Sequence, residues 1–198
     1  MARPQNLEAR ENILNSAYDL FYRGGYKGIS MDEVALKSGV KKANLFHYYP
    51  SKEQLGLAVL RRAARSYEEQ ITGRFSNDSD PIETVAGMFS DYAARMEKEG
   101  CFKGCFIGNL AQEISDENEK MRHEISKLLV FWVEHFAAFL ERHRVAGYFR
   151  GEMNSKGAAQ AMVSLLEGAT LVSKAQKNVE AMNNAQAMAS TYLKALKA

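Results

Sequence analysis

Proline and cysteine are rare in this chain of 198 residues. The three prolines are Pro4, Pro50 and Pro81, and runs of β-branched residues are scarce. Because strands are usually rich in β-branched residues, their scarcity predicts an all-α fold. The two cysteines, Cys101 and Cys105, are too few to staple a secreted fold and are expected to be free thiols.

Long apolar runs and a large net charge are also missing. No apolar stretch reaches the roughly 20 residues needed to cross a bilayer. The first ten residues, M-A-R-P-Q-N-L-E-A-R, lack the apolar centre of a signal peptide. A cytoplasmic protein that does not associate with membranes is therefore predicted. The formal net charge of +2 is too small to indicate nucleic-acid binding by itself, so that inference depends on local clustering.

Motifs for catalysis, metals and cofactors are absent from the sequence. His123, His135 and His143 are spread along one expected helix, with no cysteine or carboxylate at a metal-ligand spacing. There is no phosphate-binding loop and no dinucleotide fingerprint. The sequence therefore predicts no enzyme, no metal site and no cofactor.

A basic segment without acidic residues lies between Glu33 and Glu53. Its lysines and hydrogen-bonding side chains are Lys37, Lys41, Lys42, Asn44, His47, Tyr48, Tyr49 and Lys52. A short helix here would present a cationic, donor-rich face that suits the phosphates and base edges of DNA. The alternative is a solvated corner between two amphipathic helices.

The residues that flank this segment predict helix boundaries. Ser30 with Glu33 forms a capping box at a helix start, and Gly39 can adopt the left-handed conformation of a tight turn. Pro50 ends the short helix, and Ser51 opens the next one. Helix, glycine turn and short helix together make a helix-turn-helix unit, whose second helix enters the major groove of DNA.

The run I-S-M-D-E-V-A-L-K-S-G-V-K-K-A-N-L-F-H-Y-Y-P-S-K-E-Q-L closely resembles the DNA-binding region of the TetR family of transcriptional regulators. The resemblance implies about nine helices, with a three-helix head at residues 1–55 and a regulatory and dimerisation domain at 56–198. It implies a core position for Leu45. The residues that it implies for DNA binding are Ser30, Lys41, Lys42, Ala43, Asn44, His47, Tyr48 and Lys52. For His47 and Tyr48, the alternative is packing against the first helix.

Apolar residues at helical spacing predict the remaining helices. One begins with a capping box of Asp116 and Glu119. The last two, at about 155–174 and 179–196, are rich in alanine and glycine, which lets helices approach closely. Pairing of these two helices with a second copy would give a four-helix homodimer interface that matches a palindromic operator. The alternative is packing within one chain only.

Aromatic and methionine side chains fill the helices after residue 81, and the resemblance implies a small-molecule cavity among them. Candidate ligand residues are Asn109, Trp132, His135 and Glu167, and His135 could also face Cys105. The segments that begin G-C-F-I-G-N-L and L-L-E-G-A-T-L resemble a TetR branch that includes regulators of responses to reactive electrophiles and oxidants.

In that branch a cysteine and a lysine are the candidate sensing pair, which here correspond to Cys105 and Lys174. A helix N-terminus and a nearby ammonium group both stabilise thiolate, the reactive form. The alternative is that Cys105 is a small buried hydrophobic residue. Cys101 could act as a resolving thiol.

The function predicted from the sequence is a ligand- or redox-responsive repressor. It would bind double-stranded DNA at a palindromic operator and leave it when an inducer binds or Cys105 is modified. Two alternatives stay open: a reversible small-molecule inducer with an inert Cys105, and a structural DNA-binding protein that tolerates many sequences.

Overall fold

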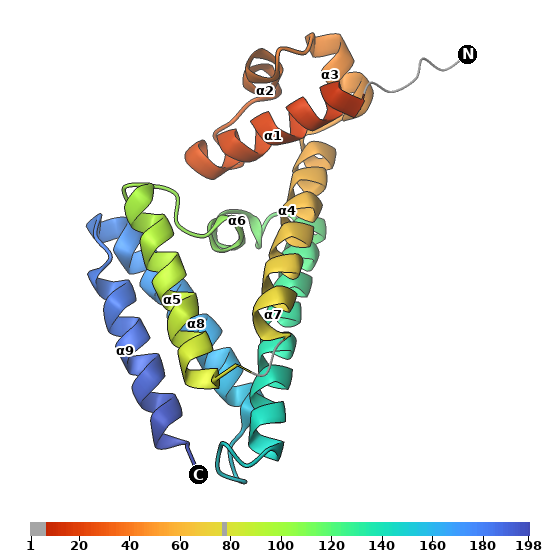
Figure 1. The fold of residues 1–198 in the computed structure, drawn as a ribbon. Coiled ribbons are helices and arrows are strands. Elements are labelled where there is room, and N and C mark those ends of the chain that lie inside the picture. The colour runs from red at the N-terminus through yellow and green to blue at the C-terminus, as the bar shows by residue number, and fades with distance from the viewer. Residues whose placement is uncertain (1–6, 77–78) are drawn as a thin grey trace. The chain divides into compact units, whose positions relative to one another are not determined.

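The computed structural model describes residues 7–76 and 79–198, which form nine α-helices (Figure 1). The prediction of an all-α fold with about nine helices is confirmed. The helices are α1 (Leu7–Gly24), α2 (Met31–Ser38), α3 (Lys42–Tyr48), α4 (Lys52–Phe75), α5 (Pro81–Lys98), α6 (Phe106–Ile114), α7 (Glu119–Val145), α8 (Ser155–Gln176) and α9 (Glu180–Ala195). None of the helices in the described ranges is both long and apolar enough to span a membrane.

Two compact units divide the chain, and α4 and α7 contribute to both. The first unit, here called the head unit, contains the described residues up to Arg65 together with Phe106–Ser126. The second, here called the core unit, contains Ser66–Cys105 and Lys127–Ala198. This division by packing places α6 with the helix-turn-helix. The functional boundary predicted at residue 55 remains a prediction.

The core of the head unit forms on the apolar stripe of α1. Ile13 and Ala17 are fully buried and Phe21 nearly so, which agrees with the spacing in the sequence. Helix α2 packs against α1, and α3 packs against α2. Fully buried Val34 and Leu45 belong to this core, so the short α3 is held by its apolar side and shows its polar side to solvent.

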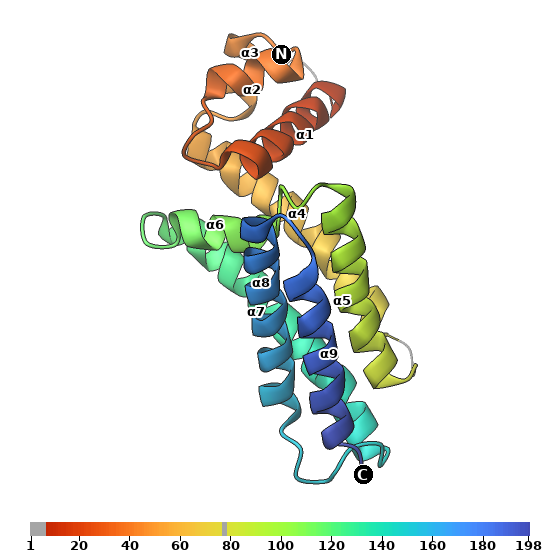
Figure 2. The same cartoon turned by 90° about the vertical axis from the view of Figure 1, so that its left-hand side faces the viewer.

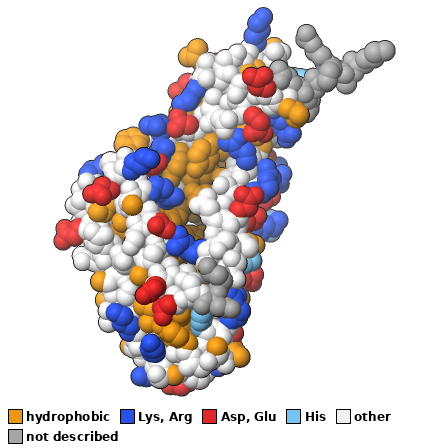
Figure 3. Space-filling view, viewed as in Figure 1, with side chains coloured by type: hydrophobic (Ala, Val, Ile, Leu, Met, Phe, Trp, Pro, Cys, Tyr) orange, Lys and Arg blue, Asp and Glu red, His pale blue; other side chains and the backbone are white. Residues whose placement is uncertain are grey.

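The core unit is a bundle in which α9 packs against both α5 and α8 (Figure 2). Its largest fully buried side chains include those of Phe89, Phe136 and Phe139. Acidic and basic side chains are interspersed on the face of the molecule shown in Figure 3. This face therefore carries no extended field of one sign, in keeping with the small net charge.

The start of α7 differs from the predicted capping box of Asp116 and Glu119. Asn118 takes the capping role instead, since its side-chain oxygen accepts a hydrogen bond of 2.9 Å from the backbone N–H of Met121. The amide group of Asn118 also donates to Glu53 at 2.9 Å. Asparagine therefore caps α7 and ties it to the first turn of α4, which a local sequence pattern does not reveal.

Candidate DNA-binding and sensing sites

The turn between α2 and α3 has the predicted geometry. The Ser30 hydroxyl accepts a hydrogen bond from the backbone N–H of Glu33 at 3.2 Å, and the Glu33 carboxylate accepts one from the Ser30 backbone at 2.7 Å. Gly39 has φ 69°, the left-handed conformation that glycine adopts without strain. The backbone N–H of Val40 then donates to the Ala35 carbonyl at 3.2 Å, which fixes the direction of the chain into α3.

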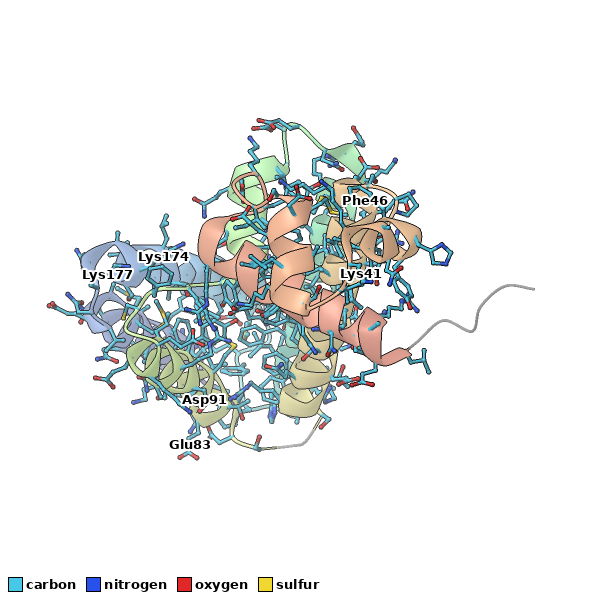
Figure 4. The ribbon with its side chains drawn as sticks, turned by 90° about the horizontal axis from the view of Figure 1, so that it is seen from above. Lys41, Phe46, Glu83, Asp91, Lys174 and Lys177 are labelled. Atoms are coloured by element: carbon cyan, nitrogen blue, oxygen red, sulfur yellow. The ribbon has the colours of Figure 1, made fainter. Side chains whose placement is uncertain are left out.

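Helix α3 separates one buried position from a row of exposed ones. Leu45 is fully buried, whereas Tyr48 is half-buried. The predicted DNA-facing residues that are exposed on or beside this helix are Lys41, Lys42, Ala43, Asn44 and His47. Lys41 is labelled in Figure 4. Because α3 has only one buried side chain, its outward face presents cationic, amide and imidazole groups together, as a recognition helix requires.

Two lysines of the predicted site have partners inside the head unit. The ammonium group of Lys42 lies 2.6 Å from the Asp32 carboxylate, and both side chains are exposed. Lys52 donates to the backbone carbonyl of Lys27 at 3.0 Å and lies over the ring of Tyr26. Partial burial lowers the pKa of Lys52, because desolvation disfavours its charged form. A phosphate would therefore compete with the carbonyl for Lys52 and with Asp32 for Lys42.

Ser30 has the capping role that the sequence predicts, and Tyr49 has a structural role that it does not predict. The Ser30 hydroxyl also donates to the Glu33 carboxylate at 2.7 Å, so both its donor and its acceptor functions serve the helix cap. Tyr49 was counted with the exposed hydrogen-bonding groups, but its side chain is buried and its hydroxyl accepts from Arg10 at 3.3 Å. The prediction that Tyr49 belongs to the donor-rich face is wrong, because its side chain is buried.

An anchor that no sequence pattern predicts joins α6 to the loop after α1. The carboxylate of Glu113 accepts hydrogen bonds from the backbone N–H groups of Tyr26 at 2.9 Å and Lys27 at 2.6 Å. A Cβ atom on Gly25 would lie 3.0 Å from a Glu113 oxygen, so the close approach favours glycine there. Phe106, the first residue of α6, also packs against Tyr18 of α1. Helix α6 is thus fixed at both of its ends to α1 and to the loop that follows α1.

A pocket of about 550 Å³ lies in the core unit. It is lined by Tyr67, Gln70, Ile71, Gly73, Arg74, Phe75, Ser79, Thr84, Met88, Asp91, Tyr92, Arg95 and Trp132. Of the predicted ligand residues, Trp132 lies in this lining. Such a volume, with aromatic walls and a few charged groups, is in the range that holds a small organic molecule.

A cluster of polar side chains surrounds Cys105 beside this pocket. The Cys105 thiol hydrogen-bonds to the carboxylate of Glu167 on α8. Tyr92 and Arg95 of α5 complete the cluster, with the guanidinium 4.2 Å from the centre of the tyrosine ring. Burial raises the pKa of Tyr92 and of Glu167, because both ionised forms lose hydration. The thiol is therefore part of a polar network and not only a small apolar side chain.

The other predicted sensing residues lie on three different helices, α6, α7 and α8. Lys174 is half-buried near the end of α8, seven residues and so about two turns beyond Glu167 (Figure 4). Its pKa is lowered by burial and then by Lys177. Asn109 belongs to the head unit. His135 stacks on Phe131 and bonds to the Phe131 carbonyl at 2.9 Å, which ties it to its own helix.

Arg95 is not among the residues predicted for the cavity, whereas Tyr92 is one of the aromatic side chains predicted to fill the helices after residue 81. They are three residues apart, so they share a face of α5 with the apolar residues that were assigned to the core. The presence of an arginine on this apolar face of α5 is the feature of the sequence that indicates a polar site there. Among the described residues, no group of three histidine, cysteine, aspartate or glutamate side chains is placed to hold a metal ion.

Comparison with protein families gives two matches. Residues 13–59 match the family described as "Bacterial regulatory proteins, tetR family". Residues 81–188, more than half of the chain, match the family described as "Transcriptional regulator LmrA/YxaF-like, C-terminal domain". Together these matches cover the helix-turn-helix and most of the core unit.

Several known proteins are similar over nearly their whole length. The chain is 27% identical over 172 residues to the regulator YxaF of Bacillus subtilis, covering 86% of this chain and 87% of that protein. It is 26% identical over 183 residues to the repressor NemR of Escherichia coli, covering 91% of each. A crystal structure of the reduced form of NemR from E. coli superposes with a TM-score of 0.85 at 25% identity, covering 96% of this chain and 97% of that one.

Proposed function

Because this chain belongs to the TetR family of bacterial transcriptional regulators, we propose that it is a repressor that binds a palindromic operator as a homodimer and is released by a signal in the core unit. Operator binding and dimerisation are what the family implies. Members of this family are regulators and not enzymes, which confirms the prediction that the chain has no catalytic function.

The exposed face of α3 is the observation that carries the proposal. Lys41, Asn44 and His47 point to solvent while Leu45 fills the core beneath them. Lysine supplies sequence-independent attraction to phosphate, and asparagine can read adenine in the major groove with two hydrogen bonds. The face thus holds both the groups that position a protein on DNA and the groups that read its sequence.

The signal that we propose is modification of Cys105, with Lys174 as the second member of the sensing pair. Cys105 is followed in the chain directly by Phe106, which packs on α1, and α6 ends at the Glu113 anchor. A change of bulk or charge at the thiol would then reach the helix-turn-helix through α6. Modification of Cys105 can shift the equilibrium between the DNA-binding and the released conformation only by the free energy with which it favours the released one.

A reversible inducer is the second candidate, and the pocket of about 550 Å³ favours it. It is lined by α4 and α5, and α4 continues into the head unit. Occupation of the pocket could therefore move α4 without any chemistry at Cys105. The relatives named as repressors leave both kinds of signal open for this chain.

The test of DNA recognition compares Asn44→Ala and His47→Ala with the wild type on DNA from upstream of the gene and on an unrelated duplex. We expect the variants to lose more affinity for the upstream site, by about 1–3 kcal/mol for a lost pair of base contacts. Glu97→Ala, on the exposed part of α5, serves as the control. Equal losses on both duplexes would place these side chains on the DNA backbone.

The test of the signal treats wild type and Cys105→Ser with a thiol-reactive electrophile before measuring binding to the same DNA. If the electrophile releases the wild type from DNA but not Cys105→Ser, Cys105 is the sensor. If both proteins stay bound, the thiol is inert and small molecules should be screened against the pocket. Binding with no preference for any sequence, unaffected by every inducer, would instead support a structural DNA-binding protein.

A further inference from the structure

Glu167 stands out among the groups around Cys105 because it is an acid with a nucleophile as its hydrogen-bond donor. Its carboxylate accepts a hydrogen bond from the Cys105 thiol, and its Oε1 atom is buried with no hydrogen-bond partner among the described residues. The residue Cys105 is only 4% exposed. A thiol shielded from water has no easy way to lose its proton to solvent, so the nearest base controls its chemistry.

We infer that Glu167 is the proton acceptor for Cys105, so that the buried thiol reacts with electrophiles by general-base catalysis and not as a free thiolate. This inference rests on the proposed sensing role of Cys105 and names the residue that makes the thiol reactive. Tyr92 and Arg95 line the pocket and also belong to the cluster around the thiol, so a neutral electrophile that enters the pocket arrives next to it.

The proposed step balances for an electrophile with a double bond conjugated to a carbonyl group. The sulfur forms a bond to the β-carbon while the thiol proton passes to the Glu167 carboxylate. The π electrons of the double bond move toward the carbonyl, and the α-carbon then takes the proton from Glu167. No oxidant or leaving group is required, and Glu167 returns to its ionised form at the end.

The charges around Glu167 support this role. Burial raises the pKa of Glu167, which makes it a stronger base than an exposed glutamate, while the thiol and Arg95 oppose that shift. Arg95 faces it from α5, and Tyr92, whose pKa burial also raises, lies beside both. Lys174 lies on the same helix, about two turns farther along. A carboxylate can also act in the opposite way, by repelling a thiolate and suppressing its reactivity.

The experiment measures the rate at which acrylamide modifies Cys105 between pH 5 and 9 in the full-length protein. Trypsin cleaves after Lys103 and Lys120, so the peptide with Cys105 is separate from the one with Cys101, and mass spectrometry follows each thiol. For the wild type we expect a rate that levels off above the raised pKa of Glu167. For Glu167→Gln we expect a rate about 10²-fold lower at pH 7 that rises tenfold with each pH unit.

The conservative variant Glu167→Asp should regain part of the wild-type rate, because it restores a carboxylate with a shorter reach. Circular dichroism and DNA binding check that the variants are folded, and if Glu167→Gln fails to fold, the wild-type profile decides alone. A wild-type rate that rises tenfold per pH unit across neutrality, or a Glu167→Gln rate equal to or above that of the wild type, would overturn the inference. Modified protein that stays on the operator would instead contradict the proposed function and leave these rates unchanged.

Discussion

Lys52 makes contacts that stabilise the fold and is also a predicted DNA-binding residue. The resemblance to TetR-family proteins implies that it binds DNA, yet its ammonium group donates to the Lys27 carbonyl and lies over Tyr26. The two roles are compatible if Lys52 bonds to the Lys27 carbonyl in the free protein and to a phosphate in the DNA complex. A measurement of DNA binding distinguishes a structural role from a DNA-binding one.

We expect Lys52→Ala to weaken binding to operator and unrelated DNA alike. The slope of log affinity against log salt concentration should fall by roughly one, since one phosphate contact is lost. Lys98→Ala, at the exposed end of α5, is the matched control. An unchanged slope with a lower melting temperature would show that Lys52 serves only the fold.

The geometry of the helix-turn-helix could be predicted because its signals are local. The capping box of Ser30, the left-handed Gly39 and the buried Leu45 are all readable within a few residues of sequence. The partners of Cys105 could not be predicted, because Arg95 and Glu167 come from two helices that lie far apart in the chain. The sequence identified Glu167 as a polar candidate but could not show that it bonds to the thiol.

At the scale of the element, α6 is the clearest difference between the predicted organisation and the packing. The sequence placed it in the regulatory domain, but it packs in the head unit through Glu113 and Phe106. Helix propensity and apolar spacing predict that α6 forms, and they carry no information about which helices it contacts. The Glu113 anchor depends on two backbone N–H groups in the loop after α1. A pattern of side chains in the sequence cannot show that these groups are its partners.

Removal of the Glu113 anchor should destabilise the protein measurably. Glu113→Ala leaves the N–H groups of Tyr26 and Lys27 without their acceptor, and hydrogen bonds to a charged group contribute about 1.5–3 kcal/mol. We expect urea denaturation to show a loss of about 1–3 kcal/mol in the free energy of unfolding. Glu117→Ala, which removes only an exposed ion pair with Lys27, should change it by less than about 1 kcal/mol. Equal effects would show that the anchor contributes no more than a surface pair.

Glu141 should make the junction between α7 and α8 sensitive to acid. Its carboxylate accepts hydrogen bonds from Arg144 and from the hydroxyl of Ser155, the first residue of α8. The Arg144 guanidinium and then the Ser155 hydroxyl lower the pKa of Glu141 to about 2. A folded-state pKa below the unfolded value gives stability that is present above the unfolded value, about 4.5, and lost as the pH falls toward 2.

Melting temperatures of wild type and Glu141→Gln test this linkage. We expect the wild type to melt higher at pH 7 and the difference between the two proteins to shrink at pH 3.5. Glu134→Gln, exposed on the same helix, is the control and should show no such change. A difference that is the same at both pH values would mean that the carboxylate charge of Glu141 does not stabilise the junction.

At the scale of the whole molecule, the predicted dimer interface depends on which side chains α8 and α9 leave exposed. The small residues predicted for the interface differ in exposure. Ala158, Ala159, Ala169, Ala185 and Ala189 are buried within one chain, Ala181 is half-buried, and Ala161, Gly168 and Ala187 are exposed. Close packing within one protomer thus explains some of the alanine and glycine residues in α8 and α9. The exposed ones are available for contact with a second copy of the chain.

The exposed sides of these two helices also carry large apolar side chains. Leu171 and Val172 on α8 are 50% and 41% exposed, and Met188 and Tyr192 on α9 are 61% and 40% exposed. Met188 and Tyr192 are four residues apart, so they share one face of α9. Apolar side chains that recur on adjoining helices are typical of a surface that pairs with another chain.

Substitution of Met188 by glutamate tests whether this surface forms the dimer on which operator binding depends. A charge in a helix–helix interface must lose its hydration without a partner, so Met188→Glu should shift the protein from dimer to monomer in sedimentation at micromolar concentration. Since a monomer brings only one head to a palindromic site, its affinity should fall by about 10²-fold or more while α3 stays intact. Val145→Glu is the matched control, because Val145 is an apolar residue at the end of α7 that is 73% exposed, somewhat more than Met188. If Met188→Glu sediments as a dimer and binds as well as the control, the two copies pair through another surface.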